Sequence, residues 1–539
     1  MKPRWERGSS ARKAMTASTD ASREGQSYAT VAVSGSAWTT LQTLLNKIAT
    51  VFAMLVLAKL LEPADFGLAN LAISVGSFAF IIAPFVMGDV LLASPSQFVR
   101  NAGTARFIAW CAGTILAVGL VVLANPIESF TEKPGLAFLL MFIVMQRPLA
   151  DAAFVIPNSR LRINLAYKTI TLIDGGVILF ATLMGVAMAY VGMGPSSLLV
   201  PPIAMIWIRA LLYRRAAGTV APSSVDRGLI VPIAKRFMIA STGQYLNSVL
   251  AILEVFVLGF FASETEIGLY GFATMLAVQT NTIIASQLGA VLQPIFAHIR
   301  HDSVRQVAAF LRATRLLSSI CVPLSLMQAA LVIPLFQLFF EKKWTGSIAI
   351  FAALSVSQTF VFVSAPSISL LKAQGRFRAY FAWQFSQFVV SVVCFIFAIK
   401  FGQDIGARIA SFVHLPVSDD ARQALALSLA SASMWSIFCP IGLWIAGRPS
   451  RLSFRTVLSV FFAPWIVAAP MAVMAVFAWS MLRASTSIWI ADVICIAVIG
   501  PLAAVIAIAG SMSLRKDTRA DIRAIFARFR RRKNPSAVQ

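Results

Sequence analysis

A stripe of polar side chains runs along one face of the long apolar segment 37–60. Its members recur at intervals of three or four residues, which brings side chains to one face of a helix, and a lysine lies beside them: Thr39, Gln42, Asn46, Thr50 and Lys47. Hydroxyl groups in apolar helices often serve packing alone, but a buried lysine needs water or a partner. We therefore expect this face to line a water-filled cavity.

A second apolar segment, 237–261, carries a comparable stripe. Gln244, Asn247 and Glu254 are three and ten residues apart, which returns them to nearly the same face of a helix. We expect Gln244 and Asn247 to face the same cavity. For Glu254 two interpretations stay open: a carboxyl that couples a proton or ion to function, or a side chain near the end of the segment with no chemical role.

Two pairs of opposite charge also lie inside apolar segments. Arg147 and Asp151 are four residues apart, so they could neutralise each other, or Arg147 could bind an anionic ligand. Asp174 and Arg209 fall at similar depth on consecutive segments. We favour a structural ion pair between these neighbours, with ion coupling through Asp174 as the alternative.

No pattern of a metal centre or of a known enzyme accompanies these groups. The three histidines and five cysteines show neither metal-ligand nor CxxC spacing. Walker A, nucleophile-elbow and kinase patterns are absent from the sequence as well. We expect no cofactor and no enzymatic activity.

The elements that must position these side chains are membrane-spanning helices. Of the 539 residues, 58% are apolar and 13% are charged, against about 25% charged residues in soluble proteins, which excludes a soluble enzyme. A run of about 20 apolar residues can cross a bilayer as a helix, and these runs lack the alternation of membrane strands. There are fourteen: 37–60, 68–88, 104–125, 135–157, 169–191, 196–213, 237–261, 269–296, 316–339, 347–368, 379–400, 422–446, 457–481 and 488–510.

The distribution of basic residues predicts the orientation of these helices. Of the 46 Lys and Arg residues, 35 lie in or beside the two tails and the even-numbered connections, and 7 lie in or beside the odd-numbered connections. Basic residues that flank membrane helices stay in the cytoplasm. We therefore expect both termini to be cytoplasmic, and we attribute the net charge of +24 to topology, not to nucleic-acid binding.

The carboxyl-terminal segment 511–539 combines many arginines with apolar residues at helical spacing. This pattern predicts either a helix that binds anionic membrane lipids or a solvated basic tail. The amino-terminal segment 1–36 is rich in Ser, Thr and Ala and is predicted to be a disordered cytoplasmic tail.

Residues 56–72 and 257–273 align without a gap at an offset of 201 residues. Both contain the end of an apolar segment, an acidic turn and an acid-apolar-Gly-Leu step. Unless the likeness is chance between two apolar hairpins, the even number of intervening helices keeps both copies in the same orientation. This predicts two six-helix lobes related by a pseudo-twofold axis along the membrane normal, the plan of transporters with a central cavity.

We accordingly expect an all-α, polytopic integral membrane protein with about 14 transmembrane helices. The predicted parts are the tail 1–36, an N-lobe at 37–213, a cytoplasmic linker at 214–236, a C-lobe at 237–446, two added helices at 457–510, and the basic tail 511–539.

Three stretches carry a resemblance to a known family: LEPADFGL at 61–68, IPLF at 333–336 leading to EKKW at 341–344, and LLKAQGR at 370–376. In this order and spacing they resemble the polysaccharide transporter branch of the multidrug/oligosaccharidyl-lipid/polysaccharide exporter superfamily, also called oligosaccharide flippases. The resemblance covers about residues 37–446. One departure is the connection 401–421, which is longer than expected.

The resemblance implies a flippase of the bacterial inner membrane that moves a lipid-linked oligosaccharide or exopolysaccharide precursor. Its diphosphate would meet the cations Lys47 and Arg147, and its sugar hydroxyls would meet Gln42, Asn46, Gln244 and Asn247. Glu254 or Asp174 would couple an ion, and a polysaccharide polymerase and export machinery would be partners. The alternatives are a multidrug exporter, a lipid II flippase of the same superfamily or, from another class, a membrane-bound sugar polymerase or ligase.

Overall fold

The computed structural model describes residues 46–80, 84–92, 97–164, 166–218, 224–299, 302–413 and 419–514. Within these ranges the chain consists of helices joined by short turns, and it contains no strand. Nine of the described helical stretches are long and apolar enough to cross a membrane, judged by length and composition. The prediction of an all-α membrane protein is confirmed.

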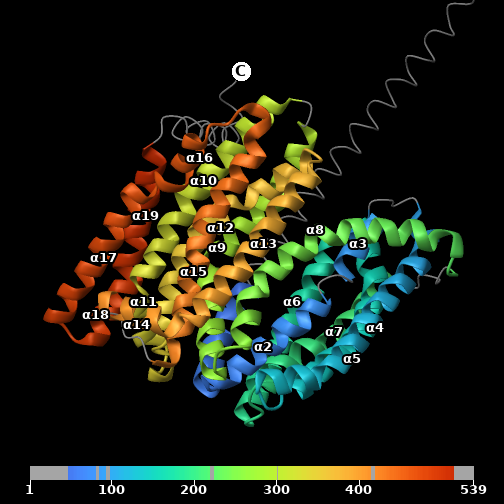
Figure 1. Cartoon of the computed structure of the whole chain (residues 1–539), viewed down its shortest axis with the longest axis horizontal. Coiled ribbons are helices and arrows are strands. Elements are labelled where there is room, and N and C mark those ends of the chain that lie inside the picture. Colours follow the sequence, from blue (N-terminus) through green and yellow to red (C-terminus); the bar gives the residue numbers. More distant parts are fainter. Residues whose placement is uncertain are drawn as a thin grey trace, which may run out of the picture.

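The first group of helices, α2 to α7, is drawn at the lower right in Figure 1. Residues 46–60 form a helix that enters this part of the chain. The labelled helices are α2 (Pro63–Phe80), α3 (Pro84–Leu92), α4 (Phe98–Thr131), α5 (Leu136–Ile163), α6 (Tyr167–Tyr190) and α7 (Ser196–Ala217). Helix α5 packs against α2, α3, α4 and α7, so it is the central element of this group.

The second group lies at the upper left in Figure 1. It contains α9 (Glu264–His298), α10 (Ser303–Ala330), α11 (Val332–Phe339), η2 (Lys342–Trp344), α12 (Ser347–Ala373), α13 (Phe377–Lys400), α14 (Gly402–Val413), η3 (Asp419–Ala421), α15 (Arg422–Gly447), η4 (Arg448–Ser450), α16 (Phe454–Phe462), α17 (Trp465–Ser485), α18 (Ile488–Ile494), η5 (Cys495–Ile499) and α19 (Gly500–Ser513). Helix α12 packs against α9, α10 and α15 and forms the centre of this group.

Helix α8 (Arg227–Gly259) runs along the boundary between the two groups. It contacts α2, α3 and α4 on one side and α9, α13 and α15 on the other. The Asp226 carboxylate accepts a hydrogen bond from the Gly228 backbone N–H at 3.0 Å and caps the start of the helix. Because of this cap, α8 begins within the predicted linker 214–236, ten residues before the predicted apolar segment. The proposed division into lobes remains a prediction.

Each of the fourteen predicted apolar segments overlaps one to three described helices. Three segments are interrupted. The segment 457–481 is divided between α16 and α17 at Pro464, whose ring removes a backbone donor and so disfavours a continuous helix. The segment 316–339 is divided between α10 and α11, and the segment 488–510 contains the short π-helical stretch η5. The connection 401–421 is longer than expected because it contains α14, which packs on α15.

The two groups meet where α2 crosses α9, in what we call the interlobe junction (residues 58–68, 262–272 and 341–345). A methyl group on Gly67 would overlap the carbonyl oxygen of Glu264, and one on Gly268 would overlap that of Pro63. Glu264 and Gly268 stand 201 residues after Pro63 and Gly67. Gly67 therefore contacts Glu264, and Gly268 contacts Pro63, the residue that aligns with Glu264. Such a reciprocal pair of contacts is what a twofold axis produces.

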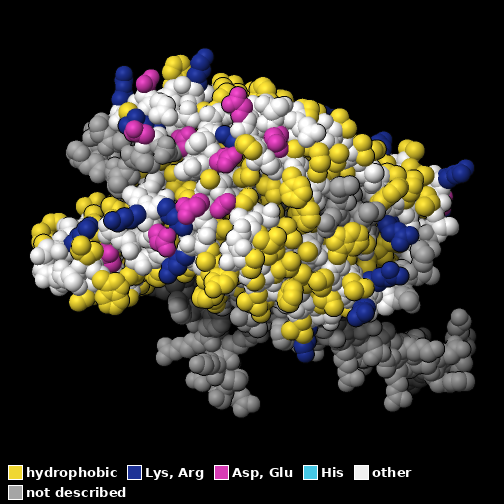
Figure 2. Space-filling model, turned by 90° about the horizontal axis from the view of Figure 1, so that it is seen from below, with side chains coloured by type: hydrophobic (Ala, Val, Ile, Leu, Met, Phe, Trp, Pro, Cys, Tyr) yellow, Lys and Arg dark blue, Asp and Glu magenta, His cyan; other side chains and the backbone are white. Residues whose placement is uncertain are grey.

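A single hydrophobic core surrounds the interlobe junction and contains residues of both groups. Helix α2 begins with Asp65 in its first turn, and α9 begins with Glu264 and Glu266, so acidic residues gather at this end of the molecule. Figure 2, which views the molecule from below, shows a cluster of acidic side chains amid hydrophobic surface.

Candidate functional site

A hydrogen bond joins the two helix groups deep in the molecule. The Lys47 ammonium donates to the Oε1 atom of Gln279 on α9 at 2.6 Å, and both side chains are partly buried. Lys47 precedes the end of its helix at Leu60 by 13 residues, and Gln279 follows the start of α9 by 15. At 1.5 Å per residue both lie about 20 Å along their helices from those two helix ends. The Lys47 ammonium therefore faces the second group. That this face lines a water-filled cavity stays a prediction.

The rest of the first polar stripe is only partly described. The Thr50 hydroxyl donates to the backbone oxygen of Asn46 at 2.7 Å, so Thr50 bonds within its own helix. The Asn46 side chain is partly buried beside Lys47. Gln42 lies outside the described residues. The predicted binding role of Asn46 and Gln42 stays a prediction.

Arg147, Gln244 and Asn247 occupy helical backbone, Arg147 in α5 and the other two in α8. Their side chains lie outside the described part of the chain, as does that of Asp151. Their predicted contacts with a ligand, or between Arg147 and Asp151, therefore stay predictions.

Glu254 lies on α8 and is held by two hydroxyl groups from other helices. The Tyr270 hydroxyl of α9 donates to its Oε2 atom, and the Ser431 hydroxyl of α15 donates to its Oε1 atom. Both donors are fully buried, and no cation of the described residues forms a salt bridge with this carboxyl. Enclosing an ionised carboxyl without a cation is costly. The arrangement suits a carboxyl that exchanges a proton or receives a cation.

Asp174 and Arg209 form the predicted ion pair between α6 and α7. The guanidinium donates to both carboxylate oxygens, at 2.8 and 3.1 Å, and the Tyr213 hydroxyl donates to Oδ1 at 2.9 Å. Arg209 also lies 4.4 Å from the centre of the Phe154 ring. A bidentate pair with this support is among the stronger polar contacts. It favours a structural role for Asp174.

The interlobe junction contains a second set of contacts between the groups. The Trp344 indole N–H donates to the Ala58 carbonyl oxygen at 2.8 Å, and its ring stacks on Phe272 with centroids 3.9 Å apart. The Phe66 ring meets Trp344 edge-on at 5.1 Å. The indole is fully buried, so it seals the apolar interior of the interlobe junction.

Lys343 lies at the edge of the interlobe junction, next to the buried Trp344. Lys343 donates to the Lys59 carbonyl oxygen at 3.2 Å and pairs with the Glu62 carboxylate at 3.4 Å. It pairs with Glu341 at the same distance. The sequence motifs at 61–68 and 341–344 thus meet in space, a contact that neither motif predicted.

Sequence reasoning missed Gln279 as well as this contact. The sequence contains one indication that Gln279 has a polar partner: the polar run Gln279-Thr280-Asn281 inside an otherwise apolar segment. Among the residues that the structure describes, no three His, Cys, Asp or Glu side chains come together as metal ligands.

Comparison of the sequence with known proteins places the chain in a family. Residues 56–349 match the family described as polysaccharide biosynthesis protein. The succinoglycan biosynthesis transport protein ExoT of Rhizobium meliloti is 23% identical over 424 residues, which cover 76% of this chain and 81% of that protein. The lipopolysaccharide biosynthesis protein WzxC of Escherichia coli is 23% identical over 397 residues, which cover 70% of this chain and 76% of that protein.

The fold is similar to that of a solved membrane protein. The lipid II flippase MurJ, in an inward closed conformation, superposes with a TM-score of 0.64 at 12% sequence identity, covering 90% of this chain and 99% of that one. At this identity the likeness shows a shared fold.

Proposed function

The chain belongs to the polysaccharide biosynthesis protein family, and on this premise we propose that it flips a lipid-linked oligosaccharide or exopolysaccharide precursor across the bacterial inner membrane. The name of ExoT supports transport in polysaccharide biosynthesis, and the name of WzxC supports a role in lipopolysaccharide biosynthesis. The observation that carries the proposal is Lys47, a cation about 20 Å into the molecule from the interlobe junction, placed between two helix groups.

The chemistry of the substrate explains why this cation matters. A polyprenyl diphosphate carries its anion between lipid and sugar, and moving that anion through a bilayer requires positive charge where water is scarce. The described partner of Lys47 is the neutral Gln279 amide, which leaves the positive charge of the ammonium uncompensated by a described carboxylate. Arg147 would supply a second cation, while Gln42, Asn46, Gln244 and Asn247 would bond sugar hydroxyls.

The interlobe junction would be the closed outer gate of this transporter. The bias of basic residues would put the acidic turns beside Gly67 and Gly268 on the outer side, with both termini in the cytoplasm. The cavity that the sequence predicts beside Lys47 would then open to the cytoplasm in this conformation and load substrate there. Rocking of the two groups about the axis between Gly67 and Gly268 would open the junction and release the substrate outside.

Glu254 is the better candidate for coupling this movement to an ion. Its carboxyl binds Tyr270 on α9 and Ser431 on α15, and α9 also forms the interlobe junction. A change of its protonation or the arrival of a cation would therefore alter contacts of the helix that moves. Asp174 is the weaker candidate, because Arg209 and Tyr213 already satisfy it.

Cellular partners follow from the same function. A polymerase and export machinery would consume the flipped precursor, and the basic tail 511–539 would bind anionic lipids at the cytoplasmic surface. The described residues end at Leu514, so most of this tail lies beyond them.

Deletion of the gene in its host tests the function directly. We expect loss of the surface polysaccharide and accumulation of a lipid-linked saccharide in the cytoplasmic leaflet, both restored by the intact chain. Normal polysaccharide together with a changed export of drugs would reject the proposal in favour of a multidrug exporter. Deletion of a polymerase gene provides the control, because it leaves the lipid-linked saccharide in the outer leaflet.

A further inference from the structure

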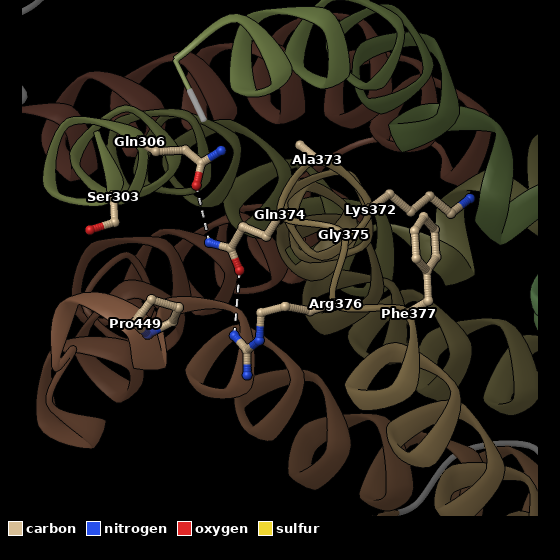
Figure 3. Close-up of a pocket in the computed structure, with 9 residues that line it drawn as sticks. All are labelled: Ser303, Gln306, Lys372, Ala373, Gln374, Gly375, Arg376, Phe377 and Pro449. Carbon is tan, nitrogen blue, oxygen red and sulfur yellow. Dashed lines mark hydrogen bonds between the residues drawn. The ribbon is translucent and has the colours of Figure 1, made fainter. Parts of the chain in front are cut away.

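A cavity of ≈ 600 Å³ opens at the end of the second helix group opposite the interlobe junction. It surrounds the turn between α12 and α13 and is bordered by the start of α10 and by η4. Figure 3 shows its lining, which includes Ser303, Gln306, Lys372, Gln374, Arg376 and Phe377. The cavity contains the motif LLKAQGR (370–376), to which the proposed transport path assigns no role.

A chain of hydrogen bonds fixes the polar wall of this cavity. Gln306 is fully buried and donates to the Phe296 carbonyl oxygen at 2.7 Å, which leaves its Oε1 atom to accept from Gln374 at 3.2 Å. Gln374 in turn accepts a bond from Arg376 at 3.4 Å. The Arg376 Nη1 atom also donates to the Ile445 carbonyl oxygen at 2.8 Å. The guanidinium is therefore held in place before any ligand arrives.

A left-handed glycine shapes the turn. Gly375 has a φ of +69°, a conformation that a side chain disfavours. The turn separates Gln374 and Arg376 on one side from Lys372 and Phe377 on the other (Figure 3). The cations Lys372 and Arg376 thus lie on opposite sides of one tight turn, and Arg376 shares its side with Gln374.

Among the described residues that line this cavity, Lys372 and Arg376 are cations and none is a carboxylate. Arg376 uses only its Nη1 atom for bonds to the described residues, so its Nε and Nη2 groups keep three N–H donors. Burial and the nearby Arg448 guanidinium lower the pKa of Arg376. Asp302 stands beside Ser303, but its carboxylate accepts a bond from the Arg305 backbone N–H and caps α10. The geometry therefore offers donors to an anion.

The depth of the cavity matches the headgroup layer of a bilayer. Helix α12 runs 27 residues from the interlobe junction to this cavity, about 40 Å, whereas the hydrocarbon core is about 30 Å thick. Phe377 at its rim is 61% exposed, and Phe454 on the adjoining α16 is 43% exposed. Aromatic side chains beside cations are typical of the membrane interface. We propose that the side of this cavity formed by Gln374 and Arg376 binds the phosphate group of an anionic membrane lipid.

Lipid retention by the purified chain tests this proposal. We expect the intact protein to keep phosphatidylglycerol through delipidation and to bind it from nanodiscs in preference to phosphatidylcholine. Arg376→Gln should weaken this binding about tenfold, because a charge-assisted hydrogen bond is lost, and Arg376→Lys should restore part of it. The matched control is Arg455→Gln, which removes an exposed positive charge from α16 outside the cavity.

A second arm separates a lipid headgroup from soluble phosphate. Inorganic phosphate in detergent, without lipid, is expected to raise the melting temperature of the intact protein far less than phosphatidylglycerol does. If inorganic phosphate alone raises it equally, and the rise is lost in Arg376→Gln, the cavity binds phosphate but not as a lipid site, which overturns the lipid assignment. Equal retention of lipid by the intact protein, Arg376→Gln and Lys372→Gln would overturn the site altogether. Binding is measured without transport, so these outcomes are independent of the proposed flippase activity.

Discussion

Gly67 and Gly268 touch where α2 crosses α9, and each lies against the backbone carbonyl of the residue four positions before the other. The contact is symmetric although the two glycines belong to different parts of one chain. It brings two backbones closer than any side chain would permit, and it places the crossing point of the two helix groups at the interlobe junction.

The first prediction concerns this crossing. Gly268→Ala would drive a methyl group into the Pro63 carbonyl oxygen, and such overpacking costs about 1–3 kcal/mol. We expect the interlobe junction to open. In a cysteine-free background, a cysteine at the buried position Ala262 should then react faster with a membrane-impermeant maleimide added outside.

Gly119→Ala is the control for this experiment. Gly119 lies in α4 with no neighbour near the position of an added methyl group. Its replacement should leave the labelling unchanged. An unchanged rate in Gly268→Ala as well would show that the crossing is not a gate.

The second prediction concerns the cation between the groups. Lys47→Ala should reduce export of the polysaccharide precursor about tenfold or more at equal protein level, because the diphosphate loses a charge-assisted partner. Gln279→Ala should cost less, since a neutral amide holds the lysine but not the anion. Complementation of a deletion strain measures both.

Lys59→Ala is the matched control, because it removes the same charge from the exposed end of the same helix. The protein should keep near-normal export in that variant. Full activity in both Lys47→Ala and Arg147→Ala would reject the cationic binding site.

The third prediction concerns the carboxyl on α8. Glu254→Gln keeps the size of the side chain but cannot exchange a proton or pair with a cation. We expect transport in membrane vesicles to lose its dependence on an imposed ion gradient, while lipid-linked substrate still binds. Tyr270→Phe and Ser431→Ala remove one donor each and should shift this dependence without abolishing it.

Glu132→Gln serves for comparison, because Glu132 is an exposed carboxylate at the end of α4. Gradient-driven transport should survive there unchanged. If it also survives in Glu254→Gln, Glu254 is not the coupling group.

The fourth prediction concerns stability. Asp174→Asn breaks the bidentate pair with Arg209 and leaves an uncompensated, largely enclosed guanidinium, which we expect to destabilise the protein by about 2–4 kcal/mol. Thermal unfolding of the purified protein measures this as a lower melting temperature. Replacing both partners, Asp174→Asn with Arg209→Gln, should recover part of the loss.

The exposed pair Arg100–Asp226 offers a contrast. Its two side chains are 68% and 39% exposed, and exposed pairs contribute about 0–1 kcal/mol. Arg100→Ala should therefore barely change the melting temperature. An equally small change in Asp174→Asn would mean that the pair in α6 and α7 is not structural.

The helices could be predicted because each membrane span must satisfy its own backbone and be apolar over a known length. Local chemistry moved their ends, as the Asp226 cap at α8 and Pro464 before α17 show. The pair Asp174–Arg209 was also predictable, since consecutive antiparallel helices bring residues of equal depth together.

Contacts between distant segments could not be read from spacing. Helical periodicity indicated that Lys47 faces a cavity. It contains no information on which of the many helices lies opposite Lys47. For this reason Gln279, which is 232 residues away in the sequence, was missed. The cavity at Arg376 likewise needs Ile445 of α15 and Pro449 of η4, which reach it only when the end of α15 and η4 fold beside the α12–α13 turn.

The 201-residue offset that pairs Gly67 with Gly268 has a consequence for how cargo can sit inside. The same offset sets Lys47 opposite Ser248 and Glu254 opposite Ala53, so the ammonium and the carboxyl each occur in one half of the predicted repeat and have no counterpart in the other half. In the predicted two-lobe arrangement, the charges of the interior would therefore differ between the lobes. A substrate that contacts both charged groups would then bind in a single orientation, with its charged end always toward the same helices.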